Sequence, residues 1–351
     1  MLKKEVAYSI LDLAVVSKGK SFRQTFDDSV AIAKLAERTG YKRYWLAEHH
    51  NMDAIGSSAT SILIGKIADE TQHIRVGSGG IMLPNHSPLI IAEQFGTLGT
   101  LYPNRIDLGL GRAPGTDQAT ASAIRSDFYE AAMQFPAEVQ KIQDYFSIDN
   151  AQQAVRANVA EGVDVPLYIL GSSTTSAYLA AEKGLPYAFA SHFASAQLME
   201  AINIYKTQFQ PSSVLDKPYS IAGISVIIAD TDEEAEFLST SYYGRVIGIL
   251  TGDRNPLEPP FEITEEFQNI IKHPAVQQMS KYAFIGSKET VKKKVKYFVE
   301  QTGVDELIVA THVFDVKDRI KSVELFAEVM RELNDGRIIL RLSGLLEKHP
   351  Y

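Results

Sequence analysis

Three apolar segments in the first third of the chain each end in a polar or glycine-rich run, and this pattern constrains the fold more than any other feature. The runs are WLAEHHN at 45–51, VGSGGIMLPNHSP at 76–88 and IDLGLGRAPGTD at 106–117. Long amphipathic segments separate them, which predicts parallel strands joined by helical crossovers. The carboxyl ends of such strands lie on one face, where α/β folds place their active sites.

The same alternation continues along the chain and predicts eight strands, the number that closes a barrel. We therefore expect an α/β fold, a single (β/α)8 TIM-barrel domain over residues 1–351. Segment 231–283 contains a cluster of three prolines and does not fit the alternation, so it is expected to be an insertion between the seventh strand and the last barrel helices. This segment would either cover the active site as a lid or only pack against the barrel. The predicted strands are 6–11, 44–47, 74–78, 106–110, 165–170, 187–190, 224–229 and 306–311.

Composition limits the classes of protein to which the chain can belong. The net charge of −8 comes from interspersed acidic residues with no basic stripe, so nucleic acid is not an expected partner. The chain has no cysteine, which removes disulfides, thiolate nucleophiles and Cys-ligated metals. No apolar run approaches the roughly 20 residues that span a bilayer, and no cleavage signal follows the N-terminus. We expect a cytoplasmic protein with no membrane partner.

Two adjacent histidines, His49 and His50, follow Glu48 at the end of the second predicted strand. Neighbouring residues on a strand point in opposite directions, so only one histidine needs to face the centre of a site. Zinc would require a spacing such as HExxH or a third clustered ligand, and neither is apparent, so no metal is expected. An isolated pair of histidines can equally be structural.

Gly79 and Gly80 directly follow the third predicted strand, within the run GSGG at 77–80. This run lacks the spacings of both the dinucleotide and the nucleoside-triphosphate loops. Glycines at a strand end let a flat ring approach the backbone or tolerate unusual geometry, although a plain turn would use the same residues.

Three serines, Ser172, Ser173 and Ser176, stand where the fifth predicted strand gives way to a helix. Free backbone N–H groups and the positive end of the helix dipole meet three hydroxyls there, which suits a phosphate monoester. Ordinary capping of a helix would need only one serine. Arg112, at the end of the neighbouring fourth strand, is a candidate clamp for the same phosphate, although a structural ion pair would also explain it.

On these residues the sequence resembles the luciferase-like, flavin-dependent monooxygenases, the superfamily named for bacterial luciferase. AEHHN at 47–51 is similar to the signature at its second strand, and residues 76–114 are similar to its longest recognisable block. Residues 170–193 and 284–311 are similar to two further blocks. Together these segments cover most of the predicted barrel.

The resemblance implies a TIM barrel that binds FMN. Enzymes of this kind use FMNH2, often drawn from a separate flavin reductase, and O2, through a flavin C4a-hydroperoxide, to oxygenate an organic substrate. On matching positions, Gly79 and Gly80 would form a bulge with a cis peptide behind the flavin ring. His49 would act near the reactive edge of the flavin, with His50 or His192 in support, and His192 would also help to hold the cofactor. The phosphate contacts would be Arg112, Ser172, Ser173 and Ser176.

Several alternatives stay open at this point. Relatives that use a deazaflavin share the fold, so the chain could be a deazaflavin-dependent reductase or dehydrogenase, or a flavin-binding protein without catalysis. The substrate is expected to be a small organic molecule, such as an aliphatic aldehyde. A homodimer is also expected, because the helices after the second and third strands carry abundant apolar residues and relatives commonly pair there. The apolar residues concerned are Ile62, Leu63, Ile64, Ile90, Ile91 and Phe95.

Overall fold

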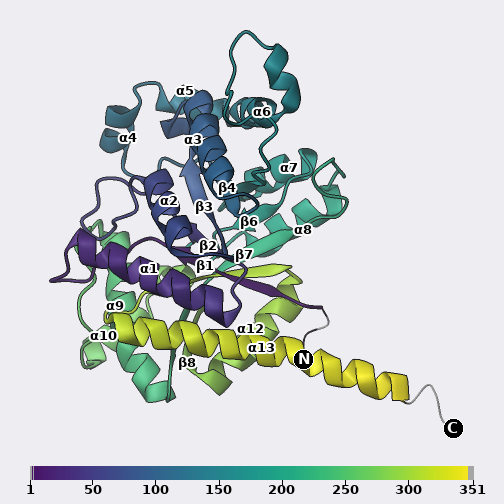
Figure 1. Ribbon diagram of the computed structural model, residues 1–351. Helices are drawn as coiled ribbons and strands as arrows, with labels where there is room; N and C mark the ends of the chain where they lie inside the picture. The colour runs from purple at the N-terminus through teal and green to yellow at the C-terminus, as the bar shows by residue number, and fades with distance from the viewer. Residues whose placement is uncertain (1, 3, 347–351) are drawn as a thin grey trace.

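The computed structural model describes residue 2 and residues 4–346, and it is a closed barrel of parallel strands with helices around it (Figure 1). Eight strands close the ring in the order β1, β2, β3, β4, β5, β6, β7 and β9, and all pairings are parallel. The predicted TIM barrel is therefore confirmed. The ring strands are β1 (Ala7–Asp12), β2 (Arg43–Leu46), β3 (Arg75–Met82), β4 (Ile106–Gly111), β5 (Leu167–Gly171), β6 (Tyr187–Phe189), β7 (Ser220–Ala229) and β9 (Glu306–Ala310).

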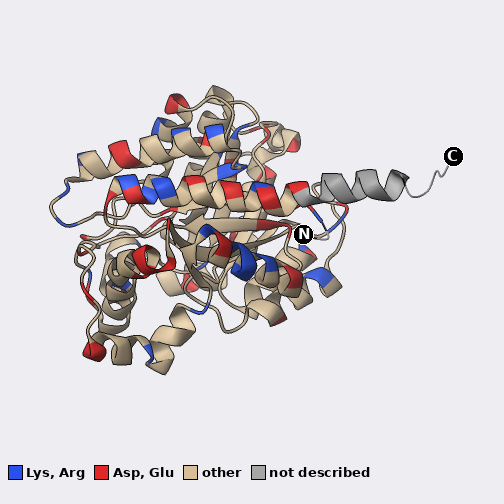
Figure 2. Ribbon diagram, turned by 90° about the horizontal axis from the view of Figure 1, so that it is seen from below, with Lys and Arg blue, Asp and Glu red and all other residues tan. Residues whose placement is uncertain are grey.

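Helices follow the strands and cover the outside of the barrel, with the long α13 lying across α1 and α12. Lys, Arg, Asp and Glu are interspersed on the face shown in Figure 2. None of the described helices is both long and apolar enough to cross a bilayer. The helices are α1 (Phe22–Thr39), α2 (Thr60–Glu70), α3 (Pro88–Leu101), α4 (Gln118–Ile124), α5 (Phe128–Met133), α6 (Phe135–Phe146), α7 (Thr174–Glu182), α8 (Leu198–Gln208), α9 (Asp232–Thr251), α10 (Glu265–Ile271), α11 (Pro274–Met279), α12 (Lys288–Thr302) and α13 (Val316–Leu346), with short 3-10 turns at Leu83–Asn85 and Ile148–Gln152.

The amino-terminal end of the barrel interior is polar and closed by charge pairs. Arg43 donates from Nε to Glu306 (2.8 Å) and from Nη1 to Asp107 (2.6 Å). Tyr168 accepts a further hydrogen bond from Arg43, and Trp45 donates to Asp107. The charged groups are buried on all sides, so each carboxylate depends on its arginine partner. This network seals the face of the barrel opposite to the strand ends described below.

A ninth strand, β8 (Ala283–Ser287), was not predicted from the sequence. It pairs with residues 225–229 of β7, whereas the pairing of β7 with β6 and β9 involves residues 220–225. The ten-residue β7 thus extends beyond the ring and offers its free edge to β8. The sequence AFIGS is short and runs directly into α12, and only its first residue, Ala283, falls within the predicted insertion.

Two helix starts show how local sequence sets a boundary. Residues 128–146 form two helices: α5 ends at Met133, and Pro136 lies in the first turn of α6, where a missing N–H costs nothing. Before α2, the hydroxyl of Ser57 donates to the carbonyl of Leu13 (2.9 Å), and α2 begins at Thr60 without a side-chain cap.

The segment predicted as an insertion consists of α9, α10 and α11 with their connections, and it ends at β8. Its stretch after α9 crosses back to the loops after β1 and β2. There the N–H of Ala54 donates to the carbonyl of Arg254 (3.1 Å), and Leu257 exchanges hydrogen bonds with Val16 and Lys18 (2.8 Å each). These contacts attach the segment to the carboxyl-terminal side of the barrel.

Candidate active site

A cavity of about 660 Å³ opens at the carboxyl-terminal ends of the strands. All eight ring strands contribute to its lining, either from their own residues or from those that immediately follow, and the wall is mainly apolar. The volume lies within the range of about 300–1,000 Å³ found for small-molecule and cofactor sites. Residues of the ring that line it include Leu11, Ala47, His49, Gly79, Gly111, Arg112, Leu170, Ser172, Ala190, His192, Ser225 and His312.

His49 faces this cavity, and its neighbour His50 does not line it. Nδ1 of His49 lies 3.1 Å from the carbonyl oxygen of Gly115, which can only accept, so Nδ1 carries the proton and Nε2 carries the lone pair. Burial lowers the pKa of His49 to about 4, and the charge of Arg245 acts in the same direction. His49 is therefore a neutral imidazole of defined tautomer near neutral pH.

Glu48 is buried beneath the histidine pair and organises the loop that carries it. Nε2 of His50 and Nε2 of His86 donate to its carboxylate (2.8 and 2.9 Å), as do the amide of Asn85 and the backbone N–H of Met82. Burial would raise the pKa of Glu48, but the hydrogen bonds from His50 and His86 lower it to about 2. The predicted catalytic residue His50 thus contacts Glu48 and does not face the cavity.

The glycines at the end of β3 form a bulge. The peptide bond between Gly79 and Gly80 is cis, as the resemblance implied, and the register against β4 shifts between Ser78 and Ile81. A Cβ on Gly80 would lie 2.8 Å from the carbonyl oxygen of Gly109, so no larger residue fits there without movement. Gly79 lines the cavity and Gly80 faces β4.

The amino terminus of α7 also borders the cavity. Ser172, Ser173 and Ser176 line it together with Arg112, so the four predicted phosphate contacts are brought together. The hydroxyl of Ser176 donates to the carbonyl of Ser173 (2.8 Å), and Ser173 is the N-cap of α7 without a side-chain capping bond. Within the described chain, Arg112 makes no hydrogen bond or ion pair. Its charge is therefore free to bind an anion.

Two further histidines complete the wall, and both follow a ring strand. His192 follows β6 and packs so closely on Gly223 that a Cβ there would lie 2.5 Å from its Nδ1. Burial lowers the pKa of His192 to about 4, and His49 contributes in the same direction. His312 follows β9, and burial lowers its pKa well below the usual value. Nδ1 of His192 and Nε2 of His312 are buried without a hydrogen-bond partner among the described residues.

Sequence reasoning missed two residues of this wall, His312 and Arg245. His312 stands directly after a strand end, so the criterion that selected His49 would also have found it. Arg245 lies in the middle of α9, within the segment treated as an insertion, and no local pattern marks it. The structure shows that α9 is part of the cavity wall, because Tyr242, Arg245, Val246 and Ile249 all line it.

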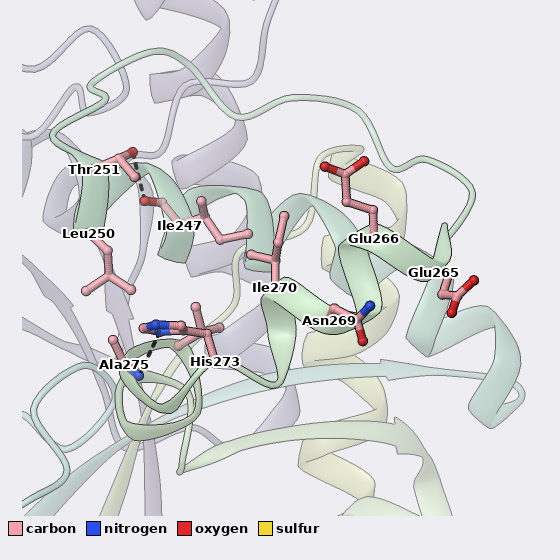
Figure 3. A pocket seen from close by; sticks show the side chains of 10 residues that line it. Ile247, Leu250, Thr251, Glu265, Glu266, Asn269, Ile270, His273 and Ala275 are labelled. Atoms are coloured by element: carbon pink, nitrogen blue, oxygen red, sulfur yellow. Dashed lines mark hydrogen bonds between the residues drawn. The ribbon is translucent and has the colours of Figure 1, made fainter.

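A second, wider hollow of about 840 Å³ lies between α9, α10 and α11 (Figure 3). Ile247, Leu250 and Ile270 give it an apolar floor, whereas Glu265 and Glu266 lie on its outer side. The ring of His273 is engaged in capping α11, where it accepts from the N–H of Ala275 (3.3 Å). The groups that could perform chemistry therefore belong to the barrel cavity. The described residues hold no cluster of His, Asp and Glu suited to a metal ion.

The closed parallel barrel, with histidines, an unpaired arginine and a helix N-terminus in one cavity at the carboxyl ends of its strands, places the protein in the class of TIM-barrel proteins with an enzyme-type site. A sequence model described as luciferase-like monooxygenase matches residues 7–306. The chain therefore belongs to the luciferase-like monooxygenase family, as the sequence resemblance indicated. Membership supports an activity of the monooxygenase or oxidoreductase type.

Individual relatives agree with this family. A luciferase-like monooxygenase of Escherichia coli is 45% identical over 95% of this chain and 99% of its own length. The N-acetyl-S-alkylcysteine monooxygenase of Bacillus subtilis is 30% identical over 93% of this chain and 98% of its own. The crystal structure of apo-MsnO8 superimposes with a TM-score of 0.85 at 32% identity, covering 93% of this chain and 99% of that one.

More distant solved structures share the fold alone. The oxygenating constituent of 3,6-diketocamphane monooxygenase from Pseudomonas putida, solved with FMN, has a TM-score of 0.68 at 18% identity and covers 93% of this chain and 97% of its own. A secondary alcohol dehydrogenase that depends on the coenzyme F420 has a TM-score of 0.66 at 16% identity, with coverage of 93% and 98%. The fold thus carries both types of cofactor.

Proposed function

We propose that this protein is a monooxygenase that binds FMN in the barrel cavity and uses reduced FMN with O2 to oxygenate a small organic substrate. The observation that carries the proposal is the meeting of Arg112 and the α7 terminus with His49 and Gly79 in one cavity. Arg112 offers unpaired positive charge beside the start of α7, and the wall also offers an apolar surface with a neutral imidazole, His49. FMN needs both, because it has a phosphate dianion at one end and a flat ring at the other.

The residues present fit FMN in their chemistry. Arg112 and the N–H groups at the start of α7 would hold the phosphate, with the hydroxyls of Ser172 and Ser173 as further partners. The backbone at Gly79 has no side chain that would hold a flat ring away. Reduced FMN would supply the reaction with O2, and the protein would orient the ring and exclude water.

Within this proposal His49 is the catalytic residue. Its Nε2 lone pair can accept a proton or a hydrogen bond in the cavity, while Gly115 holds the ring in place through Nδ1. His50, Glu48 and His86 act as positioning residues, since their hydrogen bonds fix the loop that presents His49. His192 supports the cofactor from the opposite wall.

The reduced flavin would come from a separate flavin reductase. The 3,6-diketocamphane protein is named an oxygenating constituent, which favours a two-component system in which one protein reduces the flavin and another oxygenates the substrate. The Bacillus relative acts on N-acetyl-S-alkylcysteine, so amino-acid thioethers are a reasonable first substrate class to screen alongside aliphatic aldehydes. We place the activity in the cytoplasm and in a single catalytic domain.

An anaerobic titration of the flavin-free protein with FMNH2, FMN and a deazaflavin, followed by aeration, tests this function. We expect FMNH2 to bind and O2 to be consumed after aeration. Binding of the deazaflavin alone, without consumption of O2, would favour the second candidate function, a deazaflavin-dependent dehydrogenase, which the alcohol dehydrogenase neighbour supports. Binding of none of the three would contradict both functions.

A further inference from the structure

Arg245 is a cation in the cavity wall that has no anion. It reaches the cavity from α9, and its Nε is buried without a hydrogen-bond partner. It forms no ion pair with any described residue of the chain. Burial alone lowers its pKa to about 10, with no carboxylate to offset it. Burying a polar group without a partner destabilises the fold, and burying a charged one does so more strongly, so folds rarely retain such a group without a ligand for it.

Two buried carboxylates act on the cavity histidines, Asp12 on His312 and Glu48 on His49, and both are already saturated, whereas Glu182, which lines the same cavity, is exposed to solvent. Asp12 accepts from the N–H of Ala14 (2.9 Å), from Ser29 (2.6 Å), from Tyr44 and from Arg319 (2.8 Å). Glu48 accepts from two histidines, an amide and a backbone N–H, as described above. Neither carboxylate can turn toward Arg245 without leaving these buried donors unpaired.

The other polar groups around Arg245 are neutral. Burial lowers the pKa of both His49 and His312, and the positive charge of Arg245 lowers both further. Both rings are therefore neutral near pH 7 and do not attract an anion as cations would. Nε2 of His312 and Nδ1 of His192 are themselves unpartnered. Besides Arg112 near the start of α7, the wall thus presents the guanidinium of Arg245 and unpaired imidazole nitrogens, within surroundings that are otherwise mostly apolar.

We propose that Arg245 binds a carboxylate of the organic substrate, so that the enzyme acts on small organic acids with an apolar body. The proposal rests on the proposed function in that it names the substrate class for the same cavity. A guanidinium binds a carboxylate through two parallel hydrogen bonds. The phosphate of the cofactor has its own cation, Arg112, on the loop after β4, whereas Arg245 comes from the helix after β7. This refines the expectation of a small organic substrate such as an aliphatic aldehyde.

Reduced FMN, if bound, would bring a second source of negative charge into the same cavity through its ring, and the test separates the two. Calorimetry would measure binding of butanoate, hexanoate and octanoate and of the matching neutral amides, to flavin-free and to FMN-loaded protein. The variants are Arg245→Met, which keeps length without charge, and Arg245→Lys, which keeps charge. Arg23→Met on the exposed face of α1 is the matched control.

For the wild type we expect carboxylates to bind more tightly than amides. In Arg245→Met the carboxylates should lose about ten- to a hundredfold in affinity and the amides should be unchanged, with partial recovery in Arg245→Lys. The melting temperature of Arg245→Met should be equal or higher, because an unpaired charge is removed. Selectivity for carboxylates in flavin-free protein would stand even if FMN did not bind, which separates this inference from the proposed function.

Three results would overturn the inference. The first is an equal loss for carboxylates and amides in Arg245→Met, which would mean that Arg245 only shapes the wall. The second is failure of every carboxylate to bind the wild type. The third is a change in the ratio of affinities for FMNH2 and FMN with carboxylate binding intact, which would assign Arg245 to the reduced flavin.

Discussion

The imidazole of His49 donates through Nδ1 to the carbonyl oxygen of Gly115, 3.1 Å away, and this bond joins the loop after β2 to the loop after β4. Gly115 has a positive φ of 65°, and a Cβ there would lie 2.5 Å from the carbonyl oxygen of Glu48. A side chain at this position would therefore be disfavoured by both conformation and contact. The orientation of the candidate catalytic ring thus depends on a glycine 66 residues further along the chain.

The first prediction concerns the phosphate. Arg112→Ala should weaken FMN about ten- to a hundredfold and leave riboflavin nearly unchanged, because only FMN carries the dianion that a charge-assisted contact would bind. Fluorescence titration of both ligands measures this, with Arg23→Ala as the control on a remote surface. An equal loss for both ligands would show that Arg112 does not bind the phosphate.

The second prediction concerns His49. His49→Ala should leave the affinity for FMNH2 within a few-fold but reduce substrate oxygenation by roughly 10²–10⁴, the range for a lost acid–base group. A larger share of the consumed O2 should appear as H2O2. His49→Asn keeps hydrogen bonding without titrating, so it separates the two contributions. Unchanged coupling of O2 to product in both variants would transfer the role to His192 or contradict the proposed function.

The pH dependence follows from the lowered pKa of His49. A histidine with a pKa of about 4 in the folded protein is neutral from pH 6 to 8. Titration of His49 should therefore produce no step in the pH profile of turnover over that interval, and wild type and His49→Asn should have profiles of the same shape there. Steady-state rates across this range, at saturating FMNH2, provide the measurement. A step near pH 6.5 that disappears in His49→Asn would mean that the ring is solvated and charged.

The third prediction concerns Glu48, whose pKa is lowered to about 2 by hydrogen bonds. A carboxylate with a lowered pKa stabilises the folded state above its unfolded pKa and loses this contribution as pH falls toward the folded one. Glu48→Gln should therefore be destabilised at pH 7, and the difference in free energy of unfolding from wild type should shrink by about 1 kcal/mol at pH 4. Urea titrations at both pH values measure this, and a constant difference would contradict it.

The fourth prediction concerns the buried charges at the base of the barrel. Arg43→Met would leave Asp107 and Glu306 buried with a reduced set of partners, so it should cost about 3–5 kcal/mol of unfolding free energy. Lys4→Ala, which removes a partly exposed pair with Asp305, should cost less than about 1 kcal/mol. Urea unfolding of the two variants gives the comparison, and similar losses would mean that the buried network contributes little.

The fifth prediction concerns assembly, for which a homodimer through α2 and α3 stays a proposal. Three of the six apolar residues named for it, Ile64, Ile91 and Phe95, are buried in the core, so the available surface is smaller than the sequence suggested. Ile62 and Ile90 remain 72% and 47% exposed. The double variant Ile62→Lys, Ile90→Lys should be a monomer by light scattering, whereas the wild type should be a dimer. A wild type with the mass of a monomer would contradict the proposed dimer.

Much of the barrel could be predicted because its signals are local. Strands buried on both faces are continuous apolar runs, and helices between them have an apolar face every three or four residues. β8 escaped prediction because it is held by the part of β7 that extends beyond the ring, which no property of residues 283–287 reveals. The candidate phosphate site was predictable for a similar reason, since serines at a helix start and an arginine at a neighbouring strand end are both visible in order along the chain.

Alternation of strands and helices along the chain sets the direction of every strand, so the parallel barrel and the end at which its polar residues gather follow from the order of the residues. Which of the two adjacent histidines faces the cavity depends instead on how the loops pack in three dimensions. Both histidines have the same sequence neighbourhood. Their rings point in different directions because His50 is held by Glu48, which also binds His86, whereas His49 is held by Gly115 on another loop. The absence of a carboxylate partner for Arg245 in the cavity wall also appears only in the tertiary structure, because the pairing of a charge depends on neighbours that are distant in sequence.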